Sequence, residues 1–311
     1  MLSFVFPGQG SQFVGMGKAF YQQYAFIREI FAEADQALAF SLTELIFEGP
    51  EEELKKTVNA QPAILTVSVA MHEMLKREGY KPDVVAGHSL GEYSALVAAG
   101  ALNFSDAVRL VRLRGRFMQE AVPLGQGGML AVLGLSRQQV VEGCRQAAAF
   151  GVVEAANFNC PGQVVVAGES QALERAGELF KQLGARRCIP LQVSAPFHSS
   201  LMVPAGARLA PELEKVEVKD PDIPVIANVS ADYVKTAAGV RDALIKQVSS
   251  PVLWEQSVLR MIEGGAKILL EVGPGQVLTG LIRKISKNVT GASFNDQTEP
   301  AAIYNLLKEA V

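Results

Sequence analysis

Short apolar runs alternate with longer amphipathic stretches along the first part of the chain. The runs at residues 2–6 and 83–86 predict strands. Around and between them, the spacing of apolar positions predicts two helices up to about Phe47, one helix from about Pro62, and two more helices between the second strand and Val122. This alternation of strands and helices predicts an α/β protein.

A different order of elements follows the glycine-rich segment at residues 123–128. The predicted order is strand, helix, strand, turn, strand, helix and strand, at residues 129–133, 137–149, 152–156, 160–162, 164–167, 171–183 and 187–191. Two strand-helix-strand units joined in this way are typical of a ferredoxin-like unit. We therefore expect an inserted small domain over residues 126–193.

The larger pattern resumes after this insert. It predicts a helix over residues 199–214, a strand over 224–227, helices up to Glu263, and a strand over 268–272 that ends before Gly273-Pro274-Gly275. The large α/β domain is therefore expected to be discontinuous, with residues 1–125 and 194–311 on either side of the insert.

Composition and charge narrow the classes of protein to which the chain can belong. Of its 311 residues, 49% are hydrophobic and 20% are charged, as in an ordinary globular protein, and the net charge of −3 argues against nucleic-acid binding. The first residues carry no basic segment, and no apolar run reaches the length of about 18 residues that a membrane span needs. We therefore expect a cytoplasmic protein without membrane contact. The cysteines Cys144, Cys160 and Cys188 form no C-x-x-C pair, and we expect them to be buried structural thiols.

The second predicted strand leads directly into the pentapeptide Gly87-His88-Ser89-Leu90-Gly91, and a helix-like stretch follows over residues 92–97. A serine on a sharp turn between strand and helix needs glycines two positions away on either side, because the two backbones approach too closely for side chains. The helix start supplies unpaired N–H groups for an oxyanion. Ser89 is therefore a candidate nucleophile, and the alternative is an ordinary glycine-rich turn.

An activated serine usually needs a base, and histidine is the most common one. The chain has three histidines: His72, His88 and His198. His72 falls in an amphipathic helix, where a packed or solvated side chain is expected, and His88 should point away from its neighbour Ser89. His198, just before a predicted helix, is therefore the candidate base, with a structural histidine as the alternative.

A carboxylate that would orient this histidine is hard to find in the sequence. Where a serine, an acid and a histidine follow in that order, the acid lies between the other two, yet no aspartate occurs between Asp106 and His198. Asp106 itself falls in the first turn of a predicted helix, where an acid suits the helix dipole. Glutamates of the insert have no obvious path to the site. We therefore predict a Ser89–His198 dyad in which backbone carbonyls orient the imidazole.

One arginine falls on the wrong face of its helix. The predicted helix that ends at Val122 carries Arg109, Arg112 and Arg116 on a solvated face, whereas Arg114 projects into the apolar stripe. A buried guanidinium needs a partner. Its planar fork matches a carboxylate, so we predict a site for a substrate with a free carboxylate group. The alternatives are an ion pair with an internal acid and a snorkelling side chain.

Four signatures in this order resemble those of the malonyl-CoA:acyl carrier protein transacylase family of bacterial fatty-acid synthesis. They are Phe6-Pro7-Gly8-Gln9-Gly10-Ser11-Gln12, Gly87-His88-Ser89-Leu90-Gly91-Glu92, Met118-Gln119-Glu120-Ala121 after Arg114-Gly115, and Glu271-Val272-Gly273-Pro274-Gly275. The resemblance covers essentially the whole chain. It implies an α/β-hydrolase-like large domain with an inserted ferredoxin-like small domain.

The resemblance also implies a role for individual residues. Ser89 corresponds to the acyl-bearing nucleophile, His198 to the general base and acid, and Arg114 to the residue that binds the malonyl carboxylate. The backbone N–H groups of Gln9 and Leu90 correspond to the oxyanion hole, and the backbone carbonyl of Gln247 to the group that orients the histidine. The implied substrates are malonyl-CoA and holo acyl carrier protein, with neither a metal nor a cofactor.

Selectivity and assembly are less constrained. Phe197, before the histidine, is similar to the aromatic residue of malonyl-selective acyltransferases, but Pro196 departs from the version of this motif in modular synthases, and a packing role for the ring stays open. A monomer is expected. Two other functions remain alternatives: a serine hydrolase that uses water as acceptor, and an inactive scaffold that binds carrier protein through the insert.

Overall fold

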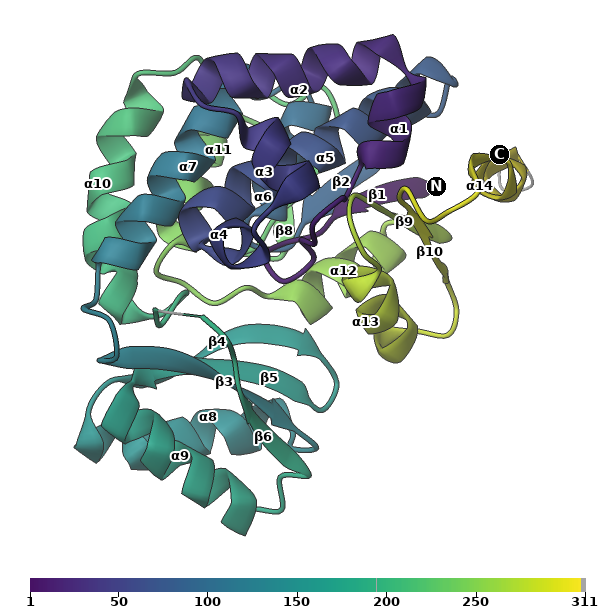
Figure 1. Ribbon diagram of the computed structural model, residues 1–311. Coiled ribbons are helices and arrows are strands. Elements are labelled where there is room, and N and C mark those ends of the chain that lie inside the picture. Colours follow the sequence, from purple (N-terminus) through teal and green to yellow (C-terminus); the bar gives the residue numbers. More distant parts are fainter. Residues whose placement is uncertain (194, 309–311) are drawn as a thin grey trace.

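The computed structural model describes residues 1–193 and 195–308 and contains two separate sheets (Figure 1). The larger sheet has six strands in the order β10-β9-β1-β2-β7-β8. Its pairs are parallel except for the antiparallel pair β7–β8. The strands are β1 Leu2–Phe6, β2 Val84–Gly87, β7 Val225–Ala227, β8 Asp232–Val234, β9 Ile268–Val272 and β10 Thr290–Phe294. The α/β class predicted from the alternating pattern is confirmed.

Helices cover both faces of this sheet, and the central strands are buried on both sides. On β1, Phe4 and Phe6 belong to one apolar core and Val5 to another, as the period of two in a strand requires. The first core includes α5 Thr57–Arg77, α6 Gly91–Ala98, α7 Phe104–Glu120 and α10 Val203–Glu214. The second is formed with α12 Trp254–Glu263 and α13 Val277–Ile285.

The remaining helices surround this body. Figure 1 shows α2 running along its edge above α3 and α5, and α14 lying beside the outer strand β10. Their bounds are α1 Lys18–Gln23, α2 Ala25–Leu38, α3 Leu42–Glu48, α4 Glu51–Lys55, α11 Ala237–Gln247 and α14 Pro300–Lys308. None of the helices among the described residues combines the length and the apolar character needed to cross a membrane.

The smaller sheet is antiparallel, with strand order β4-β5-β3-β6. It comprises β3 Gly127–Leu133, β4 Val153–Cys160, β5 Gln163–Glu169 and β6 Arg187–Pro190. The helices α8 Arg137–Ala147 and α9 Ser170–Gln182 pack on its outer face, and the short 3₁₀ helix Ala148–Phe150 follows α8 (Figure 1). Alternate residues of its strands, such as Met129 and Val165, instead join the core of the larger body.

Several boundaries differ from those predicted. The helix expected from about Pro62 begins at Thr57, with Pro62 inside it. Burial of the preceding residues Asn59, Ala60 and Gln61 outweighs the preference of proline for a first turn. The helix expected over residues 199–214 is divided into a 3₁₀ turn, Ser200–Met202, and α10. The strands β8 and β10 were not predicted, since neither carries the continuous apolar run of a buried strand.

The signature near the end of the chain has a structural explanation. Glu271 is fully buried at the end of β9, where its carboxylate accepts hydrogen bonds from the N–H groups of Leu278 (3.0 Å) and Thr279 (2.7 Å) at the start of α13. This position satisfies the unpaired donors of the helix. Gly273 has φ 140°, and a Cβ there would lie 2.8 Å from the rigid ring of Pro7, so the turn between Glu271 and the helix requires glycine.

Candidate active site

Ser89 lies at the tip of the sharp turn between β2 and α6. A Cβ on Gly87 would lie 1.9 Å from the carbonyl of Gly91, and a Cβ on Gly91 would lie 2.1 Å from the carbonyl oxygen of Phe6. Both glycines of the pentapeptide are therefore required by close backbone contacts. Ser89 itself has φ 51°, a left-handed conformation that costs free energy in a residue other than glycine. The turn directs its hydroxyl away from the sheet and toward residues of other elements.

The structure brings His198 to this hydroxyl. Ser89 Oγ lies 2.7 Å from His198 Nε2, and His198 Nδ1 lies 2.8 Å from the backbone carbonyl oxygen of Gln247. Because a carbonyl can only accept, Nδ1 carries the proton and Nε2 is free to accept from the serine. His198 is also in the left-handed region, with φ 60°. A neutral carbonyl at the end of α11 thus holds the imidazole, as predicted, in place of a carboxylate.

Burial is the main influence on the protonation of this histidine. It lowers the pKa of His198 to about 3, and the positive charge of Arg114 adds to this shift, whereas the hydrogen bonds to the backbone of Gln247 and Ser250 oppose it. The imidazole is therefore neutral and able to accept a proton throughout the physiological range.

This lowered pKa predicts an unusual pH profile. A histidine of ordinary pKa, about 6.5, would lose about 30-fold in its basic form between pH 8 and pH 5, whereas His198 remains unprotonated over that range. We expect the rate at which a fluorophosphonate labels Ser89, followed by intact-protein mass spectrometry, to change less than about threefold from pH 8 to pH 5. A fall of tenfold or more with a midpoint near pH 6.5 would contradict the assignment.

Arg114 extends from α7 into the interior, as its position in the apolar stripe predicted. It is 1% exposed, and its Nη2 donates to Ser89 Oγ (3.1 Å) and to Gln247 Oε1 (2.9 Å). Its Nη1 donates to Gln61 Oε1 (2.8 Å). Within residues 1–193 and 195–308, no carboxylate lies within the 4.0 Å of an ion pair with it, so the alternative of a structural ion pair is not supported.

One candidate oxyanion donor, Leu90, follows the nucleophile in the chain, and the other, Gln9, belongs to a loop that packs against its turn. Leu90 begins the turn into α6, and the loop that carries Gln9 packs against the same turn, since a Cβ on Gly8 would lie 2.5 Å from the carbonyl oxygen of His88. In the part of the chain that the structure describes, no protein group accepts a hydrogen bond from the N–H of Gln9 or of Leu90. Both N–H groups are thus available to an oxyanion.

Sequence reasoning missed a set of polar residues behind the turn. Asn228, just after β7, accepts from Ser89 N–H at its Oδ1 (2.7 Å) and donates from Nδ2 to the carbonyl of Gly87 (2.6 Å). Gln247 was expected to act through its backbone alone, yet its side chain contacts both Arg114 and Glu92. Burial raises the pKa of Glu92 to about 7, against the opposing effect of its hydrogen bonds and of Arg114. Among these residues, only Asn228 had a sequence feature that could have identified it, because it follows a predicted parallel strand, where site residues commonly lie.

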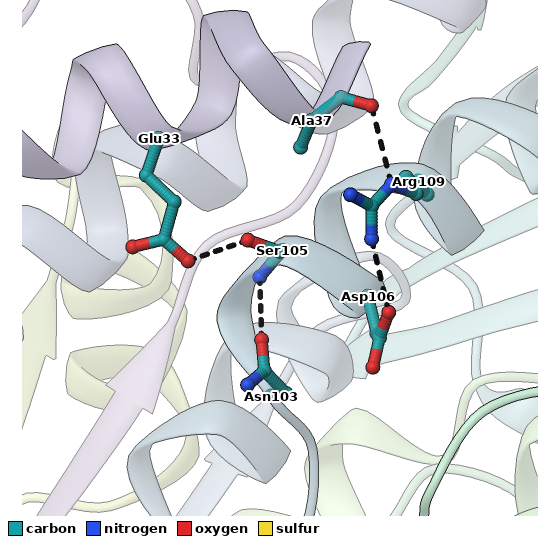
Figure 2. A network of polar contacts seen from close by, with 6 residues as sticks. All are labelled: Glu33, Ala37, Asn103, Ser105, Asp106 and Arg109. Carbon is teal, nitrogen blue, oxygen red and sulfur yellow. Dashed lines mark hydrogen bonds and ion pairs between the residues drawn. The ribbon is translucent and has the colours of Figure 1, made fainter.

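The other residues considered from sequence lie elsewhere. Asp106, in the first turn of α7, pairs with Arg109 (3.1 Å), and Figure 2 shows it in a network at that end of the helix. His88 contacts Asn159 Oδ1 through its Nε2 (2.9 Å), and His72 is buried, with its ring edge against Phe4 and Phe6. Cys144 and Cys160 are buried, as expected, but Cys188 is half-buried on the outer strand β6, where the sheet ends and covers it less.

A cavity of about 790 Å³ opens beside Gln9, where α4 and the first turn of α5 face the end of α7 and the two segments that lead to and from the smaller sheet. Apolar residues and two lysines contribute to its wall. Its lining residues are Gln9, Lys55, Lys56, Thr57, Val58, Gln119, Glu120, Val122, Pro123, Leu124, Gln192 and Val193. A long and flexible ligand could reach the candidate oxyanion donor from this side.

Comparisons with known proteins agree with this arrangement. The model of the acyl transferase domain matches residues 3–308. The chain is 49% identical to malonyl CoA-acyl carrier protein transacylase of Bacillus subtilis, over 99% of this chain and 98% of that protein. It is also 49% identical to the protein of that name from Escherichia coli K12, over 98% and 99%.

Solved structures are similar over the same length. The acyl-carrier-protein S-malonyltransferase of Burkholderia pseudomallei has a TM-score of 0.95 and 48% identity, over 99% of each chain. A malonyl-transacylase solved in complex with a type II polyketide-synthase acyl carrier protein has a TM-score of 0.95 and 45% identity, again over 99% of each chain.

Proposed function

Because the chain belongs to the acyl transferase family, and within it to the malonyl CoA-acyl carrier protein transacylases, we propose that it transfers a malonyl group from malonyl-CoA to the phosphopantetheine thiol of acyl carrier protein. The observation that supports the choice of acyl group is Arg114. Its guanidinium is buried, contacts Ser89 Oγ at 3.1 Å and pairs with neutral amides. A carboxylate on the acyl group would neutralise this charge.

In the first half-reaction Ser89 Oγ attacks the thioester carbonyl carbon while its proton passes to His198 Nε2. The N–H groups of Gln9 and Leu90 stabilise the oxyanion. Collapse of this tetrahedral intermediate breaks the carbon–sulfur bond, and His198 gives the proton to the departing CoA thiolate. The malonyl group is then bound to Ser89 as an ester. The Gln247 carbonyl, 2.8 Å from His198 Nδ1, stabilises the transient imidazolium.

The second half-reaction repeats these steps with a thiol as nucleophile. The pantetheine thiol gives its proton to His198 and attacks the ester, and the released Ser89 oxygen recovers that proton. The cavity beside Gln9, with a volume of about 790 Å³, is the proposed site for the pantetheine arm of either substrate, and Lys55 and Lys56 line its wall. Neither half-reaction requires a metal or a cofactor.

The proposed architecture follows the division of the two sheets. Residues 126–193 form a ferredoxin-like small domain, because two interlocked β-α-β units produce the strand order β4-β5-β3-β6. Residues 1–125 and 194–311 are assigned to an α/β-hydrolase-like catalytic domain, because the nucleophile lies on a strand-to-helix turn after a central parallel strand. Of this assignment, residues 194 and 309–311 lie outside the described residues. We propose that the enzyme acts as a cytoplasmic monomer.

Intact-protein mass spectrometry tests the proposed function. Brief exposure of the protein to malonyl-CoA should add one malonyl group, and holo acyl carrier protein should then remove it and gain the same mass. A serine hydrolase would instead release free malonate without a carrier protein, and a scaffold would give neither an adduct nor malonate. Either result would overturn the proposal.

Replacing Arg114 with alanine tests the carboxylate site. We expect the rate of Ser89 malonylation to fall about 100-fold, since two charge-assisted hydrogen bonds are lost. Acylation by acetyl-CoA, which has no carboxylate, should change less than about tenfold. Arg116→Ala is the matched control, because this arginine lies on the exposed face of the same helix. Equal losses for malonyl-CoA and acetyl-CoA would exclude a carboxylate-binding role.

A further inference from the structure

Glu92 is a buried carboxylate that the proposed mechanism does not use. It lies on the first turn of α6 and is 2% exposed. Its Oε2 accepts hydrogen bonds from the backbone N–H of Asn228 and from Gln247 Nε2, each at 2.9 Å. A buried carboxylate without hydrogen-bond donors would destabilise the fold, and these two donors stabilise Glu92 at this position. Both donors belong to residues that contact the nucleophile turn.

Two amide side chains hold this turn at three backbone atoms. Asn228 contacts the carbonyl of Gly87 and the N–H of Ser89, and Gln247 Nε2 donates to the carbonyl of Ser89 at 2.9 Å. Since Ser89 has φ 51°, its conformation depends on such external restraints. Glu92 contacts both of the residues that provide them.

The orientation of the Gln247 amide follows from the same contacts. Above its pKa of about 7, Glu92 is ionised and, like the carbonyl of Ser89, can only accept. The amide nitrogen must therefore face Glu92 and Ser89, and the amide oxygen is left to face Arg114. Gln247 Oε1 accepts from Arg114 Nη2 at 2.9 Å. A reversed amide would point N–H groups at the guanidinium and leave Arg114 without this acceptor.

We propose that Glu92 is a positioning residue that orients the side-chain amide of Gln247, and thereby keeps Arg114 aligned for acyl groups that bear a carboxylate. This inference rests on the proposed function and adds a determinant of its selectivity. Glu92 acts on Arg114 indirectly, through the side chain of Gln247, which contacts both. Its loss should therefore resemble a partial loss of Arg114.

The test compares the rates at which malonyl-CoA and acetyl-CoA acylate Ser89. Glu92→Ala should lower the ratio of the malonyl to the acetyl rate by at least about tenfold, the effect of one hydrogen bond to a charged group. Glu92→Gln retains an acceptor at this position and should restore the ratio to within about threefold of the wild type. Ser94→Ala, a buried substitution on the same helix, is the matched control and should leave the ratio unchanged.

A double-mutant cycle separates positioning from a general structural effect. In an Arg114→Ala background, Glu92→Ala should lower the malonylation rate no further. If the two substitutions instead reduce the malonylation rate independently, so that their fold-losses multiply, the inference is overturned. Equal losses of the malonyl and acetyl rates in Glu92→Ala would also overturn it. Thermal unfolding shows whether Glu92→Ala folds. If it does not, Glu92→Asp replaces it, because the shorter side chain moves the carboxylate away from Gln247, and the same changes in rate are expected. A wild type that takes up no malonyl group would refute the proposed function itself, whereas normal malonylation with multiplying losses would refute only the role of Glu92.

Discussion

Replacing Ser89 with alanine is expected to abolish the malonyl adduct and to lower transfer to acyl carrier protein by about four to six orders of magnitude. The reason is chemical, since Ser89 Oγ is the atom that bonds to the acyl group and the remaining groups can only bind and polarise the substrate. Without the hydroxyl, His198 is still held by the Gln247 carbonyl, and Arg114 by the side-chain amides of Gln61 and Gln247. Intact-protein mass spectrometry after exposure to malonyl-CoA gives the adduct directly.

The control for this variant is a second buried serine. Ser94 is fully buried on α6, and its hydroxyl has no hydrogen-bond partner among the described residues. Ser94→Ala should therefore form the adduct at the wild-type rate. Persistence of a malonyl adduct on Ser89→Ala, mapped by peptide analysis to another residue, would show that the nucleophile lies elsewhere.

Replacing His198 with alanine should lower the rate of Ser89 malonylation by about four orders of magnitude. Among the described residues, the imidazole and the Arg114 guanidinium are the side chains within hydrogen-bond distance of Ser89 Oγ, and a guanidinium cannot take a proton. Single-turnover measurement with malonyl-CoA isolates this step, because it does not depend on the carrier protein. Transfer from a preformed malonyl enzyme should slow similarly, since the same nitrogen acts in both half-reactions.

His72→Leu is the matched control for the histidine substitution. His72 is buried against the rings of Phe4 and Phe6, burial lowers its pKa to about 4, and its Nδ1 has no partner among the described residues. An apolar side chain of similar size should be tolerated there without loss of acylation. Malonylation of the His198→Ala variant within about tenfold of the wild type would rule out the base role.

Much of the fold was predictable because it depends on patterns that are local in the chain. The strand predicted over residues 268–272 is β9, and the six predicted elements of residues 129–191 all occur in the smaller sheet and its two helices. Prediction was wrong at two places where the apolar pattern does not show the element. The three-residue strand β8 has no apolar run of its own and is held by pairing with the neighbouring strand β7, and the helix around Pro62 extends to Thr57 because its first turn is buried.

The candidate site was predictable to a similar extent. Ser89 and Arg114 could be found because each breaks a local pattern, one as a serine between glycines and the other as a charge within an apolar stripe. Asn228 and Glu92 break no local pattern. Their importance comes from hydrogen bonds between residues that are far apart in the chain. Asn228 lies 139 positions from Ser89, and Gln247 lies 155 positions from Glu92.

The sequence by itself determined the turn that presents Ser89 and the inward direction of Arg114, because steric contacts within a turn and the period of a helix act over a few residues. Only the tertiary structure decided which groups surround the serine. His198 lies 109 positions from it, and the carbonyl that orients His198 lies another 49 positions along the chain. Such contacts form when the chain folds, since hydrogen bonds and burial depend on distance in space and leave no periodic trace in the sequence.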